Sequence, residues 1–195
     1  MELTYADFFR PRVRRSAAVY DAAAIVGGSV FIALAAQVAF YLPGTPVPVT
    51  GQTLAVLLAG VLLGGRRGAA AVALYLVEGA AGLPVFAGWG FGLARFAGPT
   101  GGYLLAFLPA AWLVGKLAQR GWDRETVKAI AAMLIGNAVI HIGGAAWLAC
   151  LFGWAKALAV GVGPFVIGDL LKVLIAAGLL PLGWKLLAKL PRVRA

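Results

Sequence analysis

The stretch GPFVIGDLLKVLIAAGLLPLGWKLL, residues 163–187, is long and apolar enough to cross a membrane as one helix. Asp169 and Lys172 interrupt its apolar run, and no further charge follows before Lys185. A charged side chain at the centre of a membrane helix costs roughly 2.5 to 3.5 kcal/mol on insertion scales. Because residues three apart share a helix face, these two either satisfy each other or bind something polar between them.

The composition of the whole chain is that of an integral membrane protein. Of its 195 residues, 62% are hydrophobic and 12% are charged, and the mean hydropathy is +0.92, whereas soluble domains are about 25% charged. This length predicts one membrane domain, residues 1–195, without a soluble module. The 17 Lys and Arg against 7 Asp and Glu mark cytoplasmic ends rather than a nucleic-acid surface. The single cysteine, Cys150, excludes an internal disulfide and a Cys-based metal site.

Segmentation by hydropathy predicts an all-α fold with about six transmembrane helices. The expected spans are residues 17–41, 53–64, 68–83, 101–117, 126–152 and 163–187. The second and third are shorter than the about 20 residues that a straight membrane helix needs. Each adjoins an irregular Gly/Pro-rich segment, residues 42–52 or 84–100. Such backbone at membrane depth must be satisfied by protein or line a cavity, and it indicates the binding site of a transporter.

Two features concern the ends of the predicted helices. Four arginines at positions 10, 12, 14 and 15 resemble the start of a secretory signal. The apolar run that follows is about 25 residues, which is too long for a signal, so a retained first helix is favoured. Before the fifth span, Asp123 is expected to be the N-cap, with Glu125 in the first turn.

The distribution of Lys and Arg predicts that both termini are cytoplasmic. With that orientation, 14 of the 17 basic residues lie inside, including Arg192 and Arg194, and only Arg95 and Lys156 lie outside. Both irregular segments then lie at the outer face, as do Glu78 and the Asp169–Lys172 pair. This arrangement predicts an outward-facing pocket.

The chain lacks the motifs of nucleotide binding. It has no GxxxxGK[ST] sequence, so any ATP that drives transport must be bound by another polypeptide. An intramembrane hydrolase based on Ser29 and His141 is a disfavoured alternative, because Ser29 has no exposing turn and no evident oxyanion donors. Asn137 lies four residues before His141 on the same helix face. We interpret His141 as an interhelical hydrogen-bonding residue and Asn137 as a pocket residue, since an amide both donates and accepts.

Aromatic residues crowd the second irregular segment. Phe86, Trp89, Phe91 and Phe96 form either an interfacial aromatic belt or the apolar wall and lid of a pocket. Arg95, in the same segment, either meets an anionic group or is solvated outside.

The Asp169–Lys172 pair itself has two interpretations. It is self-satisfied between helices, or its carboxylate accepts N–H groups from a ligand while its ammonium donates to a carbonyl or carboxylate. The second interpretation predicts a small, apolar, partly anionic solute with a urea-like or amide head.

Three ordered segments carry specific motifs: VPVTGQTLAVLLAGVLLG (47–64), LYLVEGAAGLPVFAGWGFG (74–92) and GPTGGYLLAF (98–107). Together they resemble the BioY family, the biotin-binding S components of energy-coupling-factor transporters. The resemblance covers residues 47–117, and the spacing of Asp169 and Lys172 extends it to nearly the whole chain. The match of GLPVF followed by GPTGGY is highly specific.

The resemblance implies a six-helix S component with an extracellular biotin pocket in the bacterial inner membrane. It implies no enzymatic activity, and it implies partnership with a transmembrane T component and two cytoplasmic ATPases, or self-association if the protein works alone. No metal or cofactor is expected. The alternatives that remain are an S component for another vitamin and a structural membrane subunit that binds no solute. The first helix of S components often carries an Ala-x-x-x-Ala face for the T component, and both Ala18/Ala22 and Ala35/Ala39 qualify.

By position, the last-helix pair matches the polar pair of the family that meets the ligand, and residues 98–103 match a motif beside the pocket. The expected substrate-binding residues are Asp169, Lys172, Tyr103, Asn137, Gly98, Pro99, Thr100, Phe86, Arg95 and Gln52.

Overall fold

The structure, a computed structural model, describes residues 3–189 and is almost entirely helical. The basic residues Arg192 and Arg194, which contribute to the predicted orientation, lie outside the described residues. The helices are α1 (Tyr5–Phe9), α2 (Arg14–Gln37), α3 (Gln52–Leu63), α4 (Gly65–Ala80), α5 (Ala94–Ala97), α6 (Gly101–Ala118), α7 (Thr126–Phe152), α8 (Trp154–Gly161) and α9 (Val166–Leu187). The short elements are strands β1 (Ala39–Phe40) and β2 (Val49–Thr50) and the 3₁₀ turns η1 (Ala87–Trp89), η2 (Trp122–Arg124) and η3 (Gly163–Phe165).

A helix lies at each of the six predicted spans, so the all-α class is confirmed. Among the described residues, four stretches are long and apolar enough to cross a membrane, namely Arg14–Gln37, Gly101–Ala118, Thr126–Phe152 and Trp154–Leu187. The helices at the other two predicted spans, α3 and α4, have 12 and 16 residues. At 1.5 Å per residue α3 rises by only roughly 18 Å, which is less than the roughly 30 Å thickness of the apolar layer of a bilayer.

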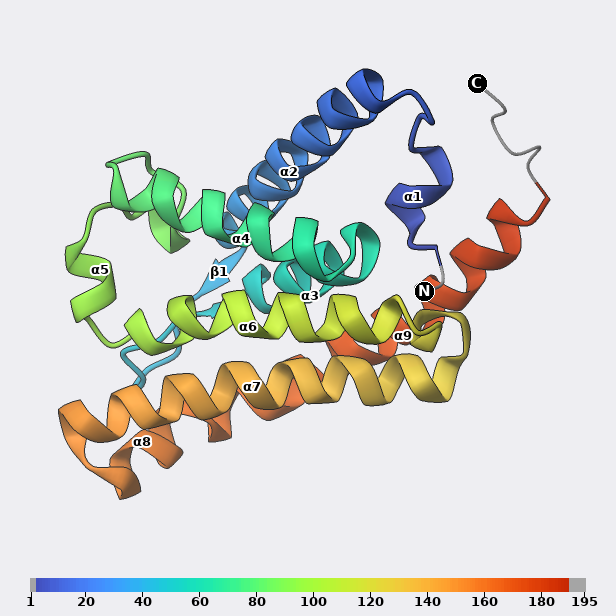
Figure 1. The fold of residues 1–195 in the computed structure, drawn as a ribbon. Helices are drawn as coiled ribbons and strands as arrows, with labels where there is room; N and C mark the ends of the chain where they lie inside the picture. The colour runs from blue at the N-terminus through green and yellow to red at the C-terminus, as the bar shows by residue number, and fades with distance from the viewer. Residues whose placement is uncertain (1–2, 190–195) are drawn as a thin grey trace.

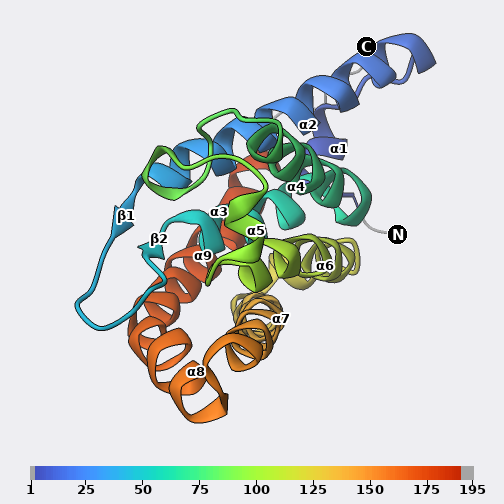
Figure 2. The same cartoon turned by 90° about the vertical axis from the view of Figure 1, so that its left-hand side faces the viewer.

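The helices place the irregular segments at one end of the molecule. Figure 1 shows β1, α5 and α8 at the left, whereas α1 and the C-terminal end of α9 lie at the right. Figure 2 looks onto the first of these ends, where β1 and β2 pair as a short antiparallel ribbon. We call this end the loop end. The prediction that both irregular segments lie on one side of the membrane agrees with this arrangement.

Small residues allow α3, α4 and α6 to pack closely. A Cβ added to Gly60 would lie 2.4 Å from the Ala111 carbonyl oxygen, and one added to Gly68 would lie 2.7 Å from the Gly60 Cα. The Gly60/Gly64/Gly68 spacing therefore serves internal packing, in which backbones approach through missing side chains.

The two Ala-x-x-x-Ala faces differ in exposure. Ala35 packs against the core, and Ala39 pairs with Thr50 in the β1–β2 ribbon. Ala18 and Ala22 are exposed on α2, whose N-terminal part extends beyond the other membrane helices (Figure 2). Only the Ala18/Ala22 face is therefore open to another helix.

Charged and aromatic contacts hold together the end of the molecule opposite the loop end. There the predicted N-cap role of Asp123 is wrong. Asp123 is not the N-cap of α7, because α7 begins at Thr126 and Glu125 precedes it without a side-chain cap. Asp123 is instead buried in η2, where its Oδ2 accepts a 2.6 Å hydrogen bond from the Trp184 indole. Its carboxylate joins η2 to α9 rather than satisfying the first turn of α7.

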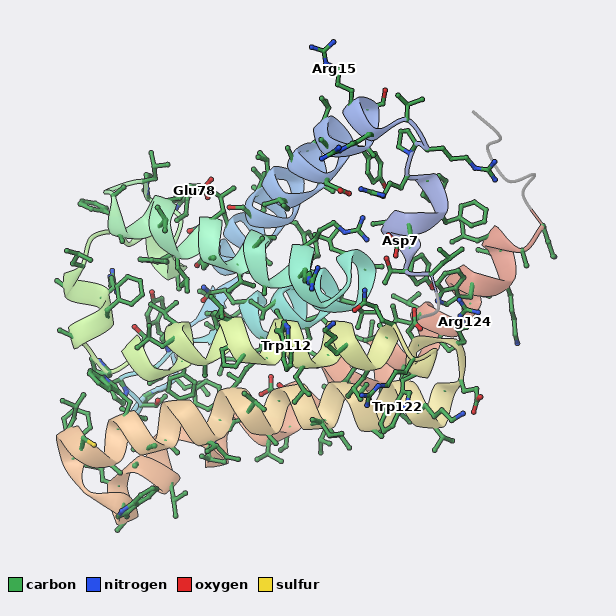
Figure 3. The ribbon with its side chains drawn as sticks, viewed as in Figure 1. Asp7, Arg15, Glu78, Trp112, Trp122 and Arg124 are labelled. Atoms are coloured by element: carbon green, nitrogen blue, oxygen red, sulfur yellow. The ribbon has the colours of Figure 1, made fainter. Side chains whose placement is uncertain are left out.

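The N-terminal helix α1 is fixed to this same end. Arg67 of α4 binds Asp7 of α1 and lies 2.9 Å from Asp21 of α2. Figure 3 shows Asp7 directed toward the bundle, whereas Arg15 projects away from the start of α2. One guanidinium group therefore ties together three helices.

Candidate functional site

A cavity of about 210 Å³ opens at the loop end. Most of its wall is apolar, and the polar groups come from four separate parts of the chain. It is lined by Tyr41, Pro46, Val47, Pro48, Thr50, Gln52, Thr53, Phe86, Ala87, Ala94, Arg95, Gly98, Pro99, Thr100, Tyr103, Leu104, Phe107, His141, Phe165 and Lys172.

Eight of the ten predicted substrate-binding residues line this cavity. They are Gln52, Phe86, Arg95, Gly98, Pro99, Thr100, Tyr103 and Lys172. The other two, Asp169 and Asn137, are buried outside its lining. The structure therefore brings together residues from positions 52 to 172 that the sequence alone could associate only by resemblance.

Lys172 is held by three acceptors. Its ammonium nitrogen lies 2.8 Å from Asp169 Oδ1, 2.8 Å from the Thr50 carbonyl oxygen and 2.9 Å from Thr53 Oγ1. An ammonium group has three N–H donors, so each is used. The amine is fixed at the cavity wall, where it presents positive charge in a fixed direction.

Asp169 lies behind this lysine. Its Oδ1 accepts hydrogen bonds from Lys172 and, at 3.2 Å, from Thr53, and its Oδ2 lies 2.6 Å from His141 Nε2. Each of the two interpretations of the Asp169–Lys172 pair therefore describes part of the structure. The side chains satisfy each other, and the lysine also forms part of the cavity.

Asn137 and His141 share a face of α7, but only His141 reaches the cavity. His141 lines the cavity. Asn137 is buried, and its Oδ1 has no hydrogen-bond partner within residues 3–189. Four residues of helix rise by about 6 Å, so Asn137 lies one turn farther from the loop end than His141. The structure does not place Asn137 in the cavity wall.

The aromatic residues of the segment 84–100 differ in their exposure. Phe86 is buried and meets Tyr75 and Phe96 edge-to-face, with centroid distances of 5.4 and 5.7 Å. Trp89 and Phe91 are 67% and 59% exposed. Phe86 therefore belongs to the pocket wall, whereas Trp89 and Phe91 occupy the positions expected of an interfacial belt.

A tight loop presents Phe86 to the cavity. Phe86 and Gly90 exchange two backbone hydrogen bonds of 2.9 and 3.1 Å, and Trp89 between them has a φ of +58°. The Gln37 side chain at the end of α2 holds this loop, because its Oε1 accepts from the Trp89 amide at 3.0 Å. The amide nitrogen of Gln37 donates to the Phe86 carbonyl at 3.3 Å.

The GPTGGY motif forms the turn into α6. The Trp147 indole on α7 donates a 2.9 Å hydrogen bond to the Gly98 carbonyl. A Cβ on Gly101 would lie 1.8 Å from the Phe96 carbonyl oxygen, so no other residue fits there. Tyr103 follows, and its hydroxyl donates to the Gly161 carbonyl at 2.6 Å. The motif thus fixes one wall of the cavity against α7 and α8.

Arg95 lies at the exposed side of the cavity on α5. Within residues 3–189 its guanidinium group forms no hydrogen bond or ion pair, in contrast to the saturated ammonium of Lys172. A guanidinium offers five N–H donors in a fork that matches a carboxylate. The site therefore has one unpaired cation at its mouth and one paired cation in its wall.

The segment between β1 and β2 covers the cavity. Pro46, Val47 and Pro48 line it, and Thr45 Oγ1 donates a 2.7 Å hydrogen bond to the Val160 carbonyl of α8. The two prolines restrict the backbone of this cover.

Three polar residues of the site were not predicted as binding residues. Thr50 and Thr53 hold Lys172. His141 makes the interhelical bond that was expected of it, from α7 to Asp169 of α9, and in addition lines the cavity. Thr53 could have been suspected, because it places a hydroxyl group at the start of a short apolar helix beside an irregular segment. Thr50 binds through its backbone carbonyl, which any residue would offer. Lys172 lies 122 residues after Thr50 and 119 after Thr53, so no local sequence pattern predicts these contacts.

The hydrolase alternative finds no support in this geometry. The Ser29 hydroxyl binds Glu78 where α2 and α4 lie side by side, and Figure 3 shows Glu78 on α4. His141 instead binds Asp169. The serine and the histidine are therefore engaged in separate contacts.

Comparisons with known proteins agree with one another. The sequence model of the BioY family matches residues 10–189. The chain is 40% identical over 131 residues to the probable biotin transporter BioY of Pyrococcus horikoshii, covering 67% of this chain and 76% of that protein. It is 41% identical over 141 residues to the biotin transporter BioY of Rhizobium etli, covering 68% and 75%. The fold is similar to the crystal structure of the S-component for biotin from an ECF-type ABC transporter, with a TM-score of 0.76, 25% identity and coverage of 90% and 95%.

Proposed function

Since the chain belongs to the BioY family, we propose that it is the biotin-binding membrane subunit of an energy-coupling-factor transporter and that it captures biotin at the outer face of the membrane. The protein is a transport subunit and not an enzyme. The observation that carries the proposal is the loop-end cavity, which combines an apolar wall with Lys172 in its side and Arg95 at its mouth.

The chemistry of biotin fits this cavity. Its ureido group has N–H donors and a carbonyl acceptor, its thioether ring is apolar, and its valerate chain ends in a carboxylate. We place the ureido head toward Lys172 and Gln52, the thioether ring against Phe86 and Tyr103, and the carboxylate toward Arg95. A charge-assisted pair with an unpartnered guanidinium is stronger than a neutral hydrogen bond, so Arg95 would select an acid over its ester or amide.

The proposed roles of Asp169 and Asn137 differ from those of the wall residues. We propose that Asp169 contributes to binding by holding Lys172, to which it is bonded at 2.8 Å. Asn137 is farther from the loop end, and its buried Oδ1 has no hydrogen-bond partner within residues 3–189. The proposed ligand position gives Asn137 no direct contact.

The partners of the protein follow from what the chain lacks. It has no nucleotide-binding motif, so we propose that two cytoplasmic ATPases act through a transmembrane T component. The exposed Ala18/Ala22 face of α2 is the proposed contact for that component, because small residues allow close helix approach. Self-association of a solitary subunit is the alternative arrangement, and we expect no nucleic-acid partner.

The protein is a multi-pass membrane protein, and we propose the bacterial inner membrane as its location. The proposed orientation has both termini in the cytoplasm and the loop end outside. Lipid covers the apolar side chains exposed along the helices, such as Leu34, Ile142 and Leu179.

Isothermal titration of the detergent-purified protein with biotin tests the proposed function. Saturable binding that other vitamins do not compete for supports it. Competition by another vitamin at lower concentration would reassign the substrate. The absence of heat with any vitamin from folded protein would indicate a structural subunit.

A further inference from the structure

The single histidine of the chain, His141, lies between the cavity and the buried Asp169. Its Nε2 is 2.6 Å from Asp169 Oδ2. Its ring meets Tyr103 of α6 at a centroid distance of 6.2 Å and Phe165 of η3 at 6.0 Å. The histidine is therefore enclosed by rings on two sides and by a carboxylate on the third.

The contact with Asp169 determines where the imidazole carries its proton. An ionised carboxylate has only acceptors, so Nε2 must be the donor in this hydrogen bond. The other nitrogen, Nδ1, is buried and has no hydrogen-bond partner within residues 3–189. A proton on Nδ1 would be a buried donor without an acceptor. The neutral Nε2–H tautomer is the form that fits the site.

The contacts around His141 centre on the Asp169 carboxylate. This carboxylate binds His141 at 2.6 Å and accepts hydrogen bonds from Lys172 and Thr53 at 2.8 and 3.2 Å. The aromatic rings of Tyr103 and Phe165 enclose the imidazole.

We propose that His141 is a positioning residue for ligand capture, holding the Asp169 carboxylate so that this in turn holds the Lys172 ammonium against the cavity. The inference rests on the proposed function, because the position of Lys172 matters only if the cavity binds a ligand. It assigns His141 a role in affinity through two consecutive hydrogen bonds. Direct contact between Nδ1 and the ligand is not required, since Nδ1 is closed off from the cavity.

Two substitutions separate this role from simple packing. In H141Q the amide nitrogen can replace Nε2 as the donor to Asp169, whereas H141L keeps a buried apolar side chain and removes the donor. We expect H141L to weaken biotin binding about tenfold or more, and H141Q to stay within about threefold of the wild type. Equal losses in both variants, or none in H141L, would overturn the inference.

A double-mutant cycle tests whether the effect passes through Asp169. In a D169N background, H141L should weaken binding by less than about twofold more, because the acceptor is already altered. In an R95Q background at the other side of the cavity, H141L should cause its full loss. Additive losses in both backgrounds would contradict transmission through Asp169.

Nuclear magnetic resonance of the wild-type protein provides a test that does not depend on folding of a variant. Because the chain has one histidine, [¹⁵N]histidine labelling gives one imidazole. We expect a protonated Nε2 and a bare Nδ1 in the ligand-free protein. An Nδ1–H tautomer, which has no proton on Nε2 to donate to Asp169, would overturn the inference.

The two proposals fail in distinguishable ways. If the wild type binds no biotin while its histidine shows the Nε2–H tautomer, the proposed function fails and the arrangement of the hydrogen bonds stands. If the wild type binds biotin and H141L binds it equally well, only the role of His141 fails.

Discussion

The Lys172 ammonium lies 2.8 Å from the carbonyl oxygen of Thr50, so the last helix is bonded directly to the segment that leads into α3. This contact joins two parts of the chain that are 122 residues apart. It means that the position of the lysine depends on the backbone of β2, which follows the cavity cover, as well as on Asp169.

Substitution of Asp169 by asparagine tests the hydrogen bonds behind the cavity. Asparagine has one acceptor oxygen where aspartate has two, so its NH₂ group must face a donor, either His141 or Lys172. We expect D169N to weaken biotin binding by about 1.5 to 3 kcal/mol, which is about 10-fold to more than 100-fold in Kd. Calorimetry of the purified, folded variant measures this loss.

A matched control for D169N is E125Q, the same acid-to-amide change at an exposed ion pair with Lys128. It lies at the end opposite the cavity and should leave the affinity unaltered. If D169N binds biotin as tightly as E125Q does, Asp169 has no part in the site.

Substitution of Gly144 by alanine tests the placement of the Tyr103 ring. A Cβ at position 144 would lie 2.2 Å from that ring, which lines the cavity. Overpacking typically costs about 1 to 3 kcal/mol, and a displaced Tyr103 ring would change the shape of the cavity that it lines. We expect G144A to lower both the thermal stability and the affinity for biotin.

The control for G144A is G178A on α9, where an added Cβ meets no atom within 4 Å. It makes the same chemical change in a helix interior and should cause no loss in either measurement. Wild-type affinity in G144A would show that the Tyr103 ring does not form a wall of the occupied site.

The sequence predicted the fold because the bilayer sets the length of its helices. The expected end of the fifth span at residue 152 and the actual end of α7 coincide, and a glycine with a φ of +82° follows directly. The expected end of the first span, residue 41, was four residues too far, because the apolar residues after Gln37 enter the β1–β2 ribbon. Hydropathy alone does not distinguish an apolar strand from the last turn of a helix.

The candidate site could be predicted only in part. Charges in an apolar helix identified Asp169 and Lys172, and specific motifs identified the turn at Gly98. The interhelical hydrogen bond expected of His141 is present, but the sequence did not predict that His141 also lines the cavity while Asn137 lies outside it. A shared helix face does not show which turn of the helix meets the cavity. The bond between Thr53 and Lys172 depends on how two distant helices pack, and periodicity within one helix contains no information on that packing.

The proposed orientation predicts where a reporter works when it is fused to the C-terminus. In the structure α1 and the end of α9 lie at the same end, as an even number of crossings requires (Figure 1). A fusion that is active only in the cytoplasm should be active, and one that is active only in the periplasm should be silent. The same reporters inserted after Gly153, in the turn between α7 and α8, are expected to give the opposite result. Activity of the periplasmic reporter at the C-terminus would contradict the proposed orientation.

Substitution of Asp7 by asparagine tests how the N-terminal helix is held. Burial alone would raise the pKa of the Asp7 carboxyl, but hydrogen bonds from Thr4 and Arg67 outweigh it and lower the pKa below its ordinary value of 3.8. The folded state thus favours the ionised form, so the stabilisation is complete above the ordinary pKa and is lost as the pH falls toward the lowered one. We expect D7N to unfold at a lower temperature than the wild type at pH 7, and the difference to shrink below about pH 4. Thermal unfolding in detergent across this range measures it, with E125Q as the exposed control that should change little at any pH. A difference that is the same at all pH values would show that Asp7 holds α1 by its shape and not by its charge.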